Sequence, residues 1–185
     1  MITKNQKLSI STSVLLILLL NNSFAQNYKW HTAGSIPDKY KMGGNPDQNH
    51  LAGSPGFLKS IESEINGFGT YMTSIIPDDY LGKRIIYSAY VKSENVNSWA
   101  GLWMRTDGKK QSCLTFDNMQ NRSIQGTNDW KKYEVVLDIP DSTTHISFGL
   151  LLAGTGKVYF DGVLLEVTNN TKAVTQFNPV ADKKE

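Results

Sequence analysis

The 185-residue chain has a single cysteine, Cys113. One cysteine cannot build a disulfide framework or a cysteine-rich zinc site within one chain. No sequence signature of a catalytic thiol surrounds Cys113, so we predict a small, buried apolar side chain in a strand. Hydrophobic residues make up 39% of the chain, which is enough for a core and excludes wholesale disorder.

Long apolar runs are missing as well. The strictly apolar run at 14–20 is much shorter than the ~20 residues needed to span a bilayer, which disfavours the alternative of a membrane anchor. The run follows Lys4 and Lys7 and precedes the small residues Ser23 and Ala25, a pattern typical of signal peptides. We therefore predict a signal peptide at 1–25, cleavage after Ala25, and a secreted or periplasmic protein with no membrane span.

An excess of positive charge is also absent. Removal of Lys4 and Lys7 with the leader leaves 17 basic and 17 acidic residues. A chain of this balance has no positive field with which to collect phosphate groups, and the electrostatic part of nucleic-acid binding is then lost. The composition therefore predicts no nucleic-acid partner.

Helical periodicity is absent from the mature chain. Short segments of alternating polar and apolar residues are separated by turn residues, a pattern typical of β-sandwiches and barrels. We predict an all-β fold, a two-sheet antiparallel β-sandwich (jelly roll) over 26–167, followed by a polar and flexible tail at 168–185. The segments expected to form strands are 56–65, 67–76, 84–92, 99–105, 112–119, 130–139, 145–153 and 158–167.

Several of these segments resemble the strands of carbohydrate-binding modules, in the galactose-binding-like superfamily. The resemblance lies in 83–92, in a Trp-x-x-Tyr strand at 130–140, in 146–154, and in 156–163, where Asp161 precedes the last apolar residues. It implies a jelly-roll fold and a non-catalytic role in ligand binding.

A narrower resemblance concerns the middle of the chain. The segments 99–105, 116–119 and 124–130 resemble a bacterial family of small exported sandwiches, which are also found appended to helix-turn-helix regulators of the AraC type. No DNA-binding helices accompany the domain in this sequence, so the resemblance does not imply a regulatory role here.

The face formed by Trp99, Gly101, Trp103 and Arg105 is the main candidate for binding. The intervening residues are apolar and predict the core side, which leaves this face exposed or concave. Aromatic rings beside a guanidinium suit a polyhydroxylated ligand, since rings stack on C–H surface and polar groups bind hydroxyls. The residues expected to bind ligand are Trp99, Trp103, Arg105, Asp117, Asn118, Tyr90 and Gln120.

Other interpretations stay open at this point. In a structural interpretation, Trp99 and Trp103 are covered by a loop and Arg105 is paired with Asp117. A protein-interaction sandwich would use the same face to dock a partner. A hydrolase would require two carboxylates across a cleft, and the paired acids at 62–64 and 78–79 do not lie beside the aromatic face.

Metal binding is the last question that the sequence raises. Asp161 resembles a final-strand aspartate that helps to hold a structural calcium in many such modules, and Asp38, Asn45 and Asp47 could supply further oxygens. The chain has no EF-hand spacing, and a hydrogen-bonding role for Asp161 is favoured. We predict no cofactor and leave the metal site unassigned.

Overall fold

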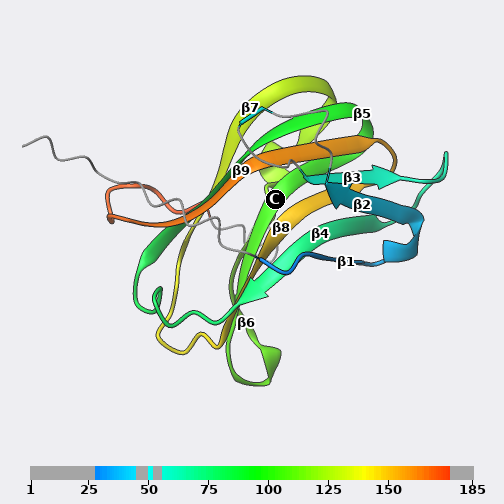
Figure 1. The fold of residues 1–185 in the computed structure, drawn as a ribbon. Coiled ribbons are helices and arrows are strands. Elements are labelled where there is room, and N and C mark those ends of the chain that lie inside the picture. Colours follow the sequence, from blue (N-terminus) through cyan, green and yellow to red (C-terminus); the bar gives the residue numbers. More distant parts are fainter. Residues whose placement is uncertain (1–27, 45–49, 52–55, 176–185) are drawn as a thin grey trace, which may run out of the picture.

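The computed structural model describes residues 28–44, 50–51 and 56–175, which form nine antiparallel strands and short 3-10 turns (Figure 1). This confirms the predicted all-β fold. The strands are β1 (His31–Gly34), β2 (Tyr40–Gly44), β3 (Gly56–Ser60), β4 (Phe68–Ile75), β5 (Arg84–Asp107), β6 (Cys113–Asp117), β7 (Ile124–Asp138), β8 (His145–Ala153) and β9 (Lys157–Thr168). The described residues contain no helix that could cross a membrane.

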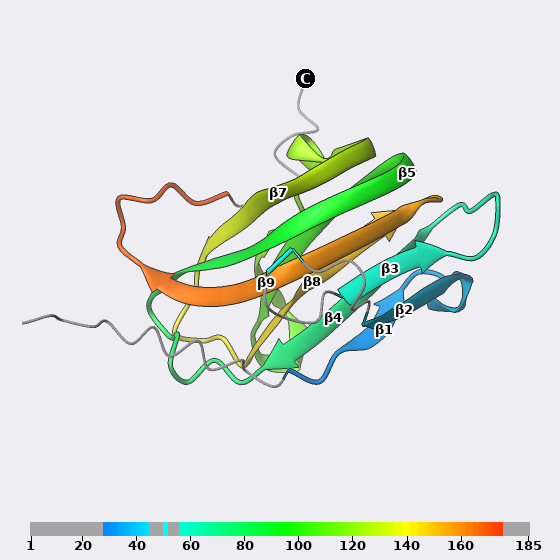
Figure 2. The ribbon, with the colours of Figure 1, turned by 45° about the horizontal axis from the view of Figure 1, so that its top comes forward.

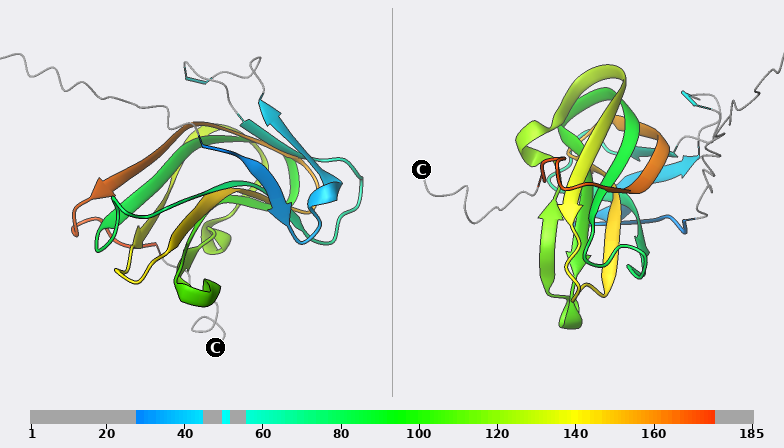
Figure 3. Two further views of the ribbon diagram at one scale, coloured as in Figure 1. Left: turned by 60° about the horizontal axis from the view of Figure 1, so that its bottom comes forward. Right: turned by 90° about the vertical axis from the view of Figure 1, so that its left-hand side faces the viewer.

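The long strand β5 belongs to both layers of the sandwich. Its first half, 84–94, pairs with β7 and β9, and its second half, 99–107, pairs with β8 and β6. The chain turns between the halves near Asn95, whose φ of 52° lies in a region that asparagine tolerates. Figures 2 and 3 show β5 curving from one layer into the other.

Two five-stranded layers result from this arrangement. The β8 sheet has the order β1-β4-β8-β5-β6 and uses the second half of β5, whereas the β9 sheet has the order β2-β3-β9-β5-β7 and uses the first half. The sequence predicted the two halves as separate strands and did not predict β1 or β2, which are only four and five residues long.

The core lies between the two layers and follows the alternation seen in the sequence. Ile85, Tyr87, Ala89 and Val91 point into it from one half of β5, and Leu102 from the other half. Burial of an aliphatic or aromatic side chain of this size contributes about 1.5–3 kcal/mol. The predicted core side of the segment 99–105 is thus confirmed, and the alternation in 84–92 also separates a core side from an outer side.

Cys113 is exposed, so its predicted burial is wrong. It is the first residue of β6, and the register between β5 and β6 shifts beside its partner Asp107. Its neighbours two and four positions along, Thr115 and Asp117, are buried as the alternation requires. Alternation therefore holds within β6 but fails at the strand end, where the second layer no longer covers the side chain.

Residues 169–175 pack against the β9 sheet rather than leaving it. Arg84 donates hydrogen bonds to the carbonyl oxygens of Asn170 (2.9 Å) and Lys172 (2.7 Å), and the Thr175 amide donates to Val136 O at 2.9 Å. The hydrogen bond from Lys172 to Glu134 lowers the pKa of Glu134. The start of the predicted flexible tail is thus anchored, and 176–185 lie outside the described residues.

Substitution of Gly149 by alanine is expected to destabilise the β8 sheet. A Cβ at this position would lie 2.3 Å from Tyr71 O and 2.9 Å from Met72 Cα, both backbone atoms of β4. Overpacking of this kind costs about 1–3 kcal/mol, measurable by urea denaturation. Gly44→Ala is the control, because no atom lies within 4 Å of its added Cβ, and the idea fails if both variants unfold alike.

Candidate functional site

Trp103 lies on the outer face of the β8 sheet, as the alternation predicts, but only 8% of its surface is exposed. Its Nε1 donates a 2.6 Å hydrogen bond to Thr70 Oγ1, and Thr70 donates in turn to Leu150 O at 2.9 Å. Gly149 stands opposite Trp103 and leaves room for the indole close to the sheet. The expectation that this ring is open to solvent is wrong.

Arg105 and Asp117 do not form a pair. Arg105 instead binds Asp107, with Nη2 at 2.6 Å and Nε at 2.8 Å from Oδ1. Asp117 is completely buried and accepts hydrogen bonds from Arg122, at 3.1 and 2.6 Å, and from the Met119 amide at 2.9 Å. The oxygens of Asp117 therefore hold the turn after β6 in place.

The remaining predicted residues are dispersed. Asn118 Oδ1 accepts a hydrogen bond from the Gln120 amide at 3.1 Å, and the Gln120 side chain is exposed. Trp99 lies half-buried at the far end of the β8 sheet, opposite Ala153. Tyr90 lies on the other layer, because β5 changes sheets between Tyr90 and Trp99. The structure therefore does not bring the predicted residues together in one site.

A second aromatic group lies on the outer face of the β9 sheet, around Tyr90. Trp130 from β7 and Tyr159 from β9 have ring centroids 6.3 Å apart. The His50 ring stacks on Trp130 at 5.1 Å with an interplanar angle of 19°, and it lies 4.5 Å from the Tyr90 ring. We call Tyr90, Trp130, Tyr159 and His50 the aromatic face. Tyr159 is buried and packs beside Trp130, so the rings that a ligand can reach are the other three.

Charged side chains border the aromatic face. Lys157 Nζ lies 4.3 Å from the centroid of the Tyr159 ring, and the Tyr159 hydroxyl donates to Glu94 Oε2 at 3.3 Å. Lys92 stands opposite Tyr159 in the sheet, and Lys132 stands opposite Tyr90. Aromatic surface with both donors and acceptors at its rim can bind a ligand that has a flat apolar side and several hydroxyl groups.

Sequence reasoning did not identify Trp130, Tyr159 or His50 as site residues. The signal was present in β9, where Tyr159 and Asp161 alternate with the apolar residues Val158 and Phe160, which lie in the core. No local pattern places His50 against this strand, since the contact spans more than a hundred residues.

Asp161 anchors the segment that carries His50. Its Oδ2 accepts hydrogen bonds from the amides of His50 (3.2 Å) and Leu51 (2.8 Å), and its Oδ1 accepts one from Gly162 (2.7 Å). The favoured hydrogen-bonding role of Asp161 is confirmed. Within the residues that the structure describes, no three His, Cys, Asp or Glu side chains form a metal-binding group, and Asn45 and Asp47 lie outside them.

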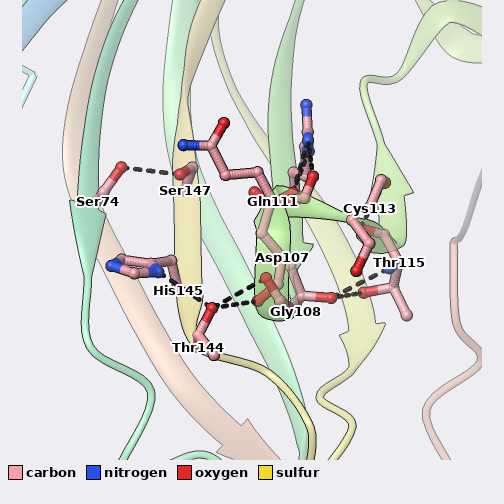
Figure 4. Close-up of polar contacts among 12 residues, drawn as sticks. Ser74, Asp107, Gly108, Gln111, Cys113, Thr115, Thr144, His145 and Ser147 are labelled. Atoms are coloured by element: carbon pink, nitrogen blue, oxygen red, sulfur yellow. Dashed lines mark hydrogen bonds and ion pairs between the residues drawn. The ribbon is translucent and has the colours of Figure 1, made fainter.

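At the polar end of the β8 sheet, side-chain hydrogen bonds stabilise the turns between strands. Figure 4 shows Ser74 and Ser147 on neighbouring strands, with their hydroxyl oxygens 2.8 Å apart, and His145 beside Thr144. Thr144 Oγ1 donates to the carbonyl oxygens of Asp107 (3.0 Å) and Gly108 (3.2 Å). These hydrogen bonds tie the loop before β8 to the end of β5.

Comparison with solved structures decides the type of sandwich. The C-terminal family 22 carbohydrate-binding module of Clostridium thermocellum Xyn10B matches with a TM-score of 0.56 and 12% identity over 80% of this chain and 89% of that module. The fold is that of a carbohydrate-binding-module β-sandwich. A family 4 module superposes with this sandwich at a TM-score of 0.51 and 14% identity, covering 78% of this chain and 91% of that one.

The enzymatically active domain of bacteriophage CBA120 tailspike protein 4 contains a similar region, with a TM-score of 0.57 and 13% identity over 77% of this chain but 20% of that one. Identities this low establish the module fold alone. No model of a protein family matches the chain.

One curated relative is much closer in sequence. The uncharacterized HTH-type transcriptional regulator YbfP of Bacillus subtilis (strain 168) is 41% identical over 138 residues, which is 74% of this chain and 47% of the regulator. The chain thus spans about half the length of its relative. The expected likeness to sandwiches appended to helix-turn-helix regulators is confirmed.

Proposed function

We propose that this protein is a non-catalytic module that binds a carbohydrate-like ligand at the aromatic face. The observation that carries the proposal is the stacking of the His50 ring on Trp130, at 5.1 Å and 19°, beside the half-buried Tyr90. This surface already accepts a flat ring in parallel contact. The module fold supports the same ligand class.

The rim supplies the polar half of recognition. A sugar presents a C–H face that stacks on an aromatic ring, while its hydroxyls require both donors and acceptors. Glu94 offers carboxylate oxygens and Lys132 offers an ammonium group, on the two strands that carry Tyr90 and Trp130. Asp161 is already committed to three backbone amides and serves to hold the face rather than to contact ligand.

Replacement of Trp130 by alanine tests the proposal. Loss of the stacking platform is expected to weaken binding about 5- to 150-fold, equivalent to about 1–3 kcal/mol, with little change in melting temperature. A glycan array on residues 26–185 would find the ligand, and calorimetry with the best hit would compare the variants. The control is Phe116→Ala, a half-buried ring of β6, in the other sheet.

Other outcomes would overturn the proposal. Release of product from an array hit would make the protein a hydrolase. A silent array, or equal affinity of Trp130→Ala and the unaltered chain, would favour the alternative of a protein-interaction sandwich. That alternative draws support from the regulator relative, in which the matching region is joined to further protein.

Export belongs to the same proposal and is supported by the leader pattern at 1–25. Mass spectrometry of the protein released by its own host is expected to show Gln26 as the first residue, in open or cyclised form. Recovery of the chain with 1–25 intact from a membrane fraction would contradict this prediction.

A further inference from the structure

A hollow of about 330 Å³ lies at one end of the β8 sheet, and none of its lining residues belongs to the aromatic face. It is formed where the start of β4, the corner of β5 and the end of β8 meet. Its lining residues are Ile65, Asn66, Gly67, Phe68, Asn97, Ser98, Trp99, Ala153 and Gly154. Trp99 is the one residue of the predicted site that lies in it.

The sheet register gives the hollow two aromatic walls. Phe68 on β4 and Trp99 on β5 both stand opposite Ala153 on β8, so the three residues form one row across three adjacent strands. Adjacent strands are about 4.8 Å apart, which places the two ring-bearing residues about 9.6 Å apart across a methyl group. Ala153 has only a methyl group between them, which leaves room for a ligand ring to stack on either aromatic side chain.

The floor of the hollow is rigid backbone. The Tyr40 hydroxyl donates to the carbonyl oxygens of Gly154 (2.8 Å) and Gly67 (3.3 Å), and the Gly154 amide donates to Gly67 O at 3.0 Å. Burial raises the pKa of Tyr40 to about 12, so the hydroxyl keeps the proton that it donates. The hollow is therefore preformed and needs little ordering when a ligand enters.

The polar part of the lining is neutral. Asn66, Asn97 and Ser98 contribute amide and hydroxyl groups, and no residue of the lining is ionisable. Asn97 Oδ1 accepts a 2.8 Å hydrogen bond from the Thr155 amide, which fixes that side chain and leaves its NH₂ group as a donor. The lining has no charge to pair with a charged ligand, and its amide and hydroxyl groups suit a neutral one.

We propose that this hollow is a second binding site, which holds one neutral pyranose ring between Phe68 and Trp99 with its hydroxyls bound by the amides of the rim. It differs from the aromatic face in position and in its lack of charge. The protein would then bind a glycan at two points, and neither site depends on the other.

Fluorine NMR of the chain labelled with 5-fluorotryptophan tests both sites in one sample. The sequence has four tryptophans, Trp30, Trp99, Trp103 and Trp130, whose signals single Trp→Phe variants assign. The probes are methyl glycosides of glucose, galactose, mannose and xylose, each titrated to 100 mM. We expect at least one of them to shift the Trp99 signal saturably, with a Kd on the order of 1–10 mM.

The variants separate recognition from stability. Phe68→Ala should weaken the Trp99 response at least tenfold, whereas Phe116→Ala should leave it unchanged. Asn66→Ala, at an exposed position of the rim, should weaken it without affecting the fold. The Trp103 signal, from a buried ring, reports whether each variant is folded.

The experiment can disprove the two proposed binding sites separately. No saturable shift at Trp99 with any of the four glycosides, or an equal shift in Phe68→Ala, overturns the second site. Saturation by N-acetyltyrosinamide but by no glycoside would assign the hollow to an aromatic side chain of a protein partner, and this also overturns it. The Trp130 signal reports on the aromatic face separately, so either site can fail without the other.

Discussion

Replacement of Trp103 by alanine is expected to destabilise the protein by about 3–5 kcal/mol, the cost of removing a large buried aromatic side chain. Only 8% of the Trp103 surface is exposed, and removal of the indole also leaves Thr70 without the donor that reaches it at 2.6 Å. Thermal melts should show a fall in Tm of roughly 6–20 °C for a domain of this size.

Two further variants show whether the fall in Tm of Trp103→Ala comes from lost packing. Leu102→Ala lies on the core side of the same strand and should cost about 2–5 kcal/mol, so the two variants should melt in the same range. Trp103→Phe keeps a ring and loses the hydrogen bond to Thr70, which should cost less. A Trp103→Ala protein as stable as the unaltered chain would show that the indole is not part of the packed structure and would restore it as a ligand platform.

Trp103 shows what alternation can and cannot predict. The period of two correctly separates Trp103 from Leu102 and Met104, which lie in the core. It does not say whether the outer face is covered, because that depends on Thr70 and Gly149 from other strands. The face of the sheet on which a side chain lies follows from the local sequence. Its exposure to solvent depends on residues that are distant in sequence.

Tyr90 shows a second limit. Its side of the strand was predictable, but its sheet was not, because β5 turns at Asn95 without a break and carries its two halves into different layers. Residues of one apparent run thus separate onto opposite outer faces. The aromatic face likewise combines β5, β7, β9 and the His50 segment, a grouping that only the tertiary fold creates.

The β-sandwich fold could be predicted from the sequence because several strands along the chain each carry a separate signal. β5 and β9 carry their own alternation, β8 is a short and strongly apolar run, and turn residues such as Gly82 and Gly154 bound these strands. An error in one strand leaves the others intact. A site has no such redundancy, since it depends on a few side chains whose neighbours come from elsewhere.

Replacement of Arg122 by alanine is expected to cost about 3–5 kcal/mol, although the arginine itself is partly exposed at the end of the short 3-10 turn Gln120–Arg122. Its guanidinium provides two of the hydrogen bonds to Asp117, which has no exposed surface. Removal of one partner leaves a buried carboxylate uncompensated, and this is more costly than the pair is stabilising. Urea denaturation of the folded protein measures the loss.

Two comparisons separate this effect from general disturbance of the turn. Arg105→Ala also breaks an ion pair, with Asp107, but the Arg105 side chain is 40% exposed, so solvent replaces the contact and the loss should stay below about 1 kcal/mol. In the Arg122→Ala background, Asp117→Asn should recover part of the stability, because the neutral amide needs no counter-charge and can still accept from the Met119 amide. Equal losses for Arg122→Ala and Arg105→Ala, or no recovery in the double variant, would mean that the buried charge of Asp117 does not determine the stability of this turn.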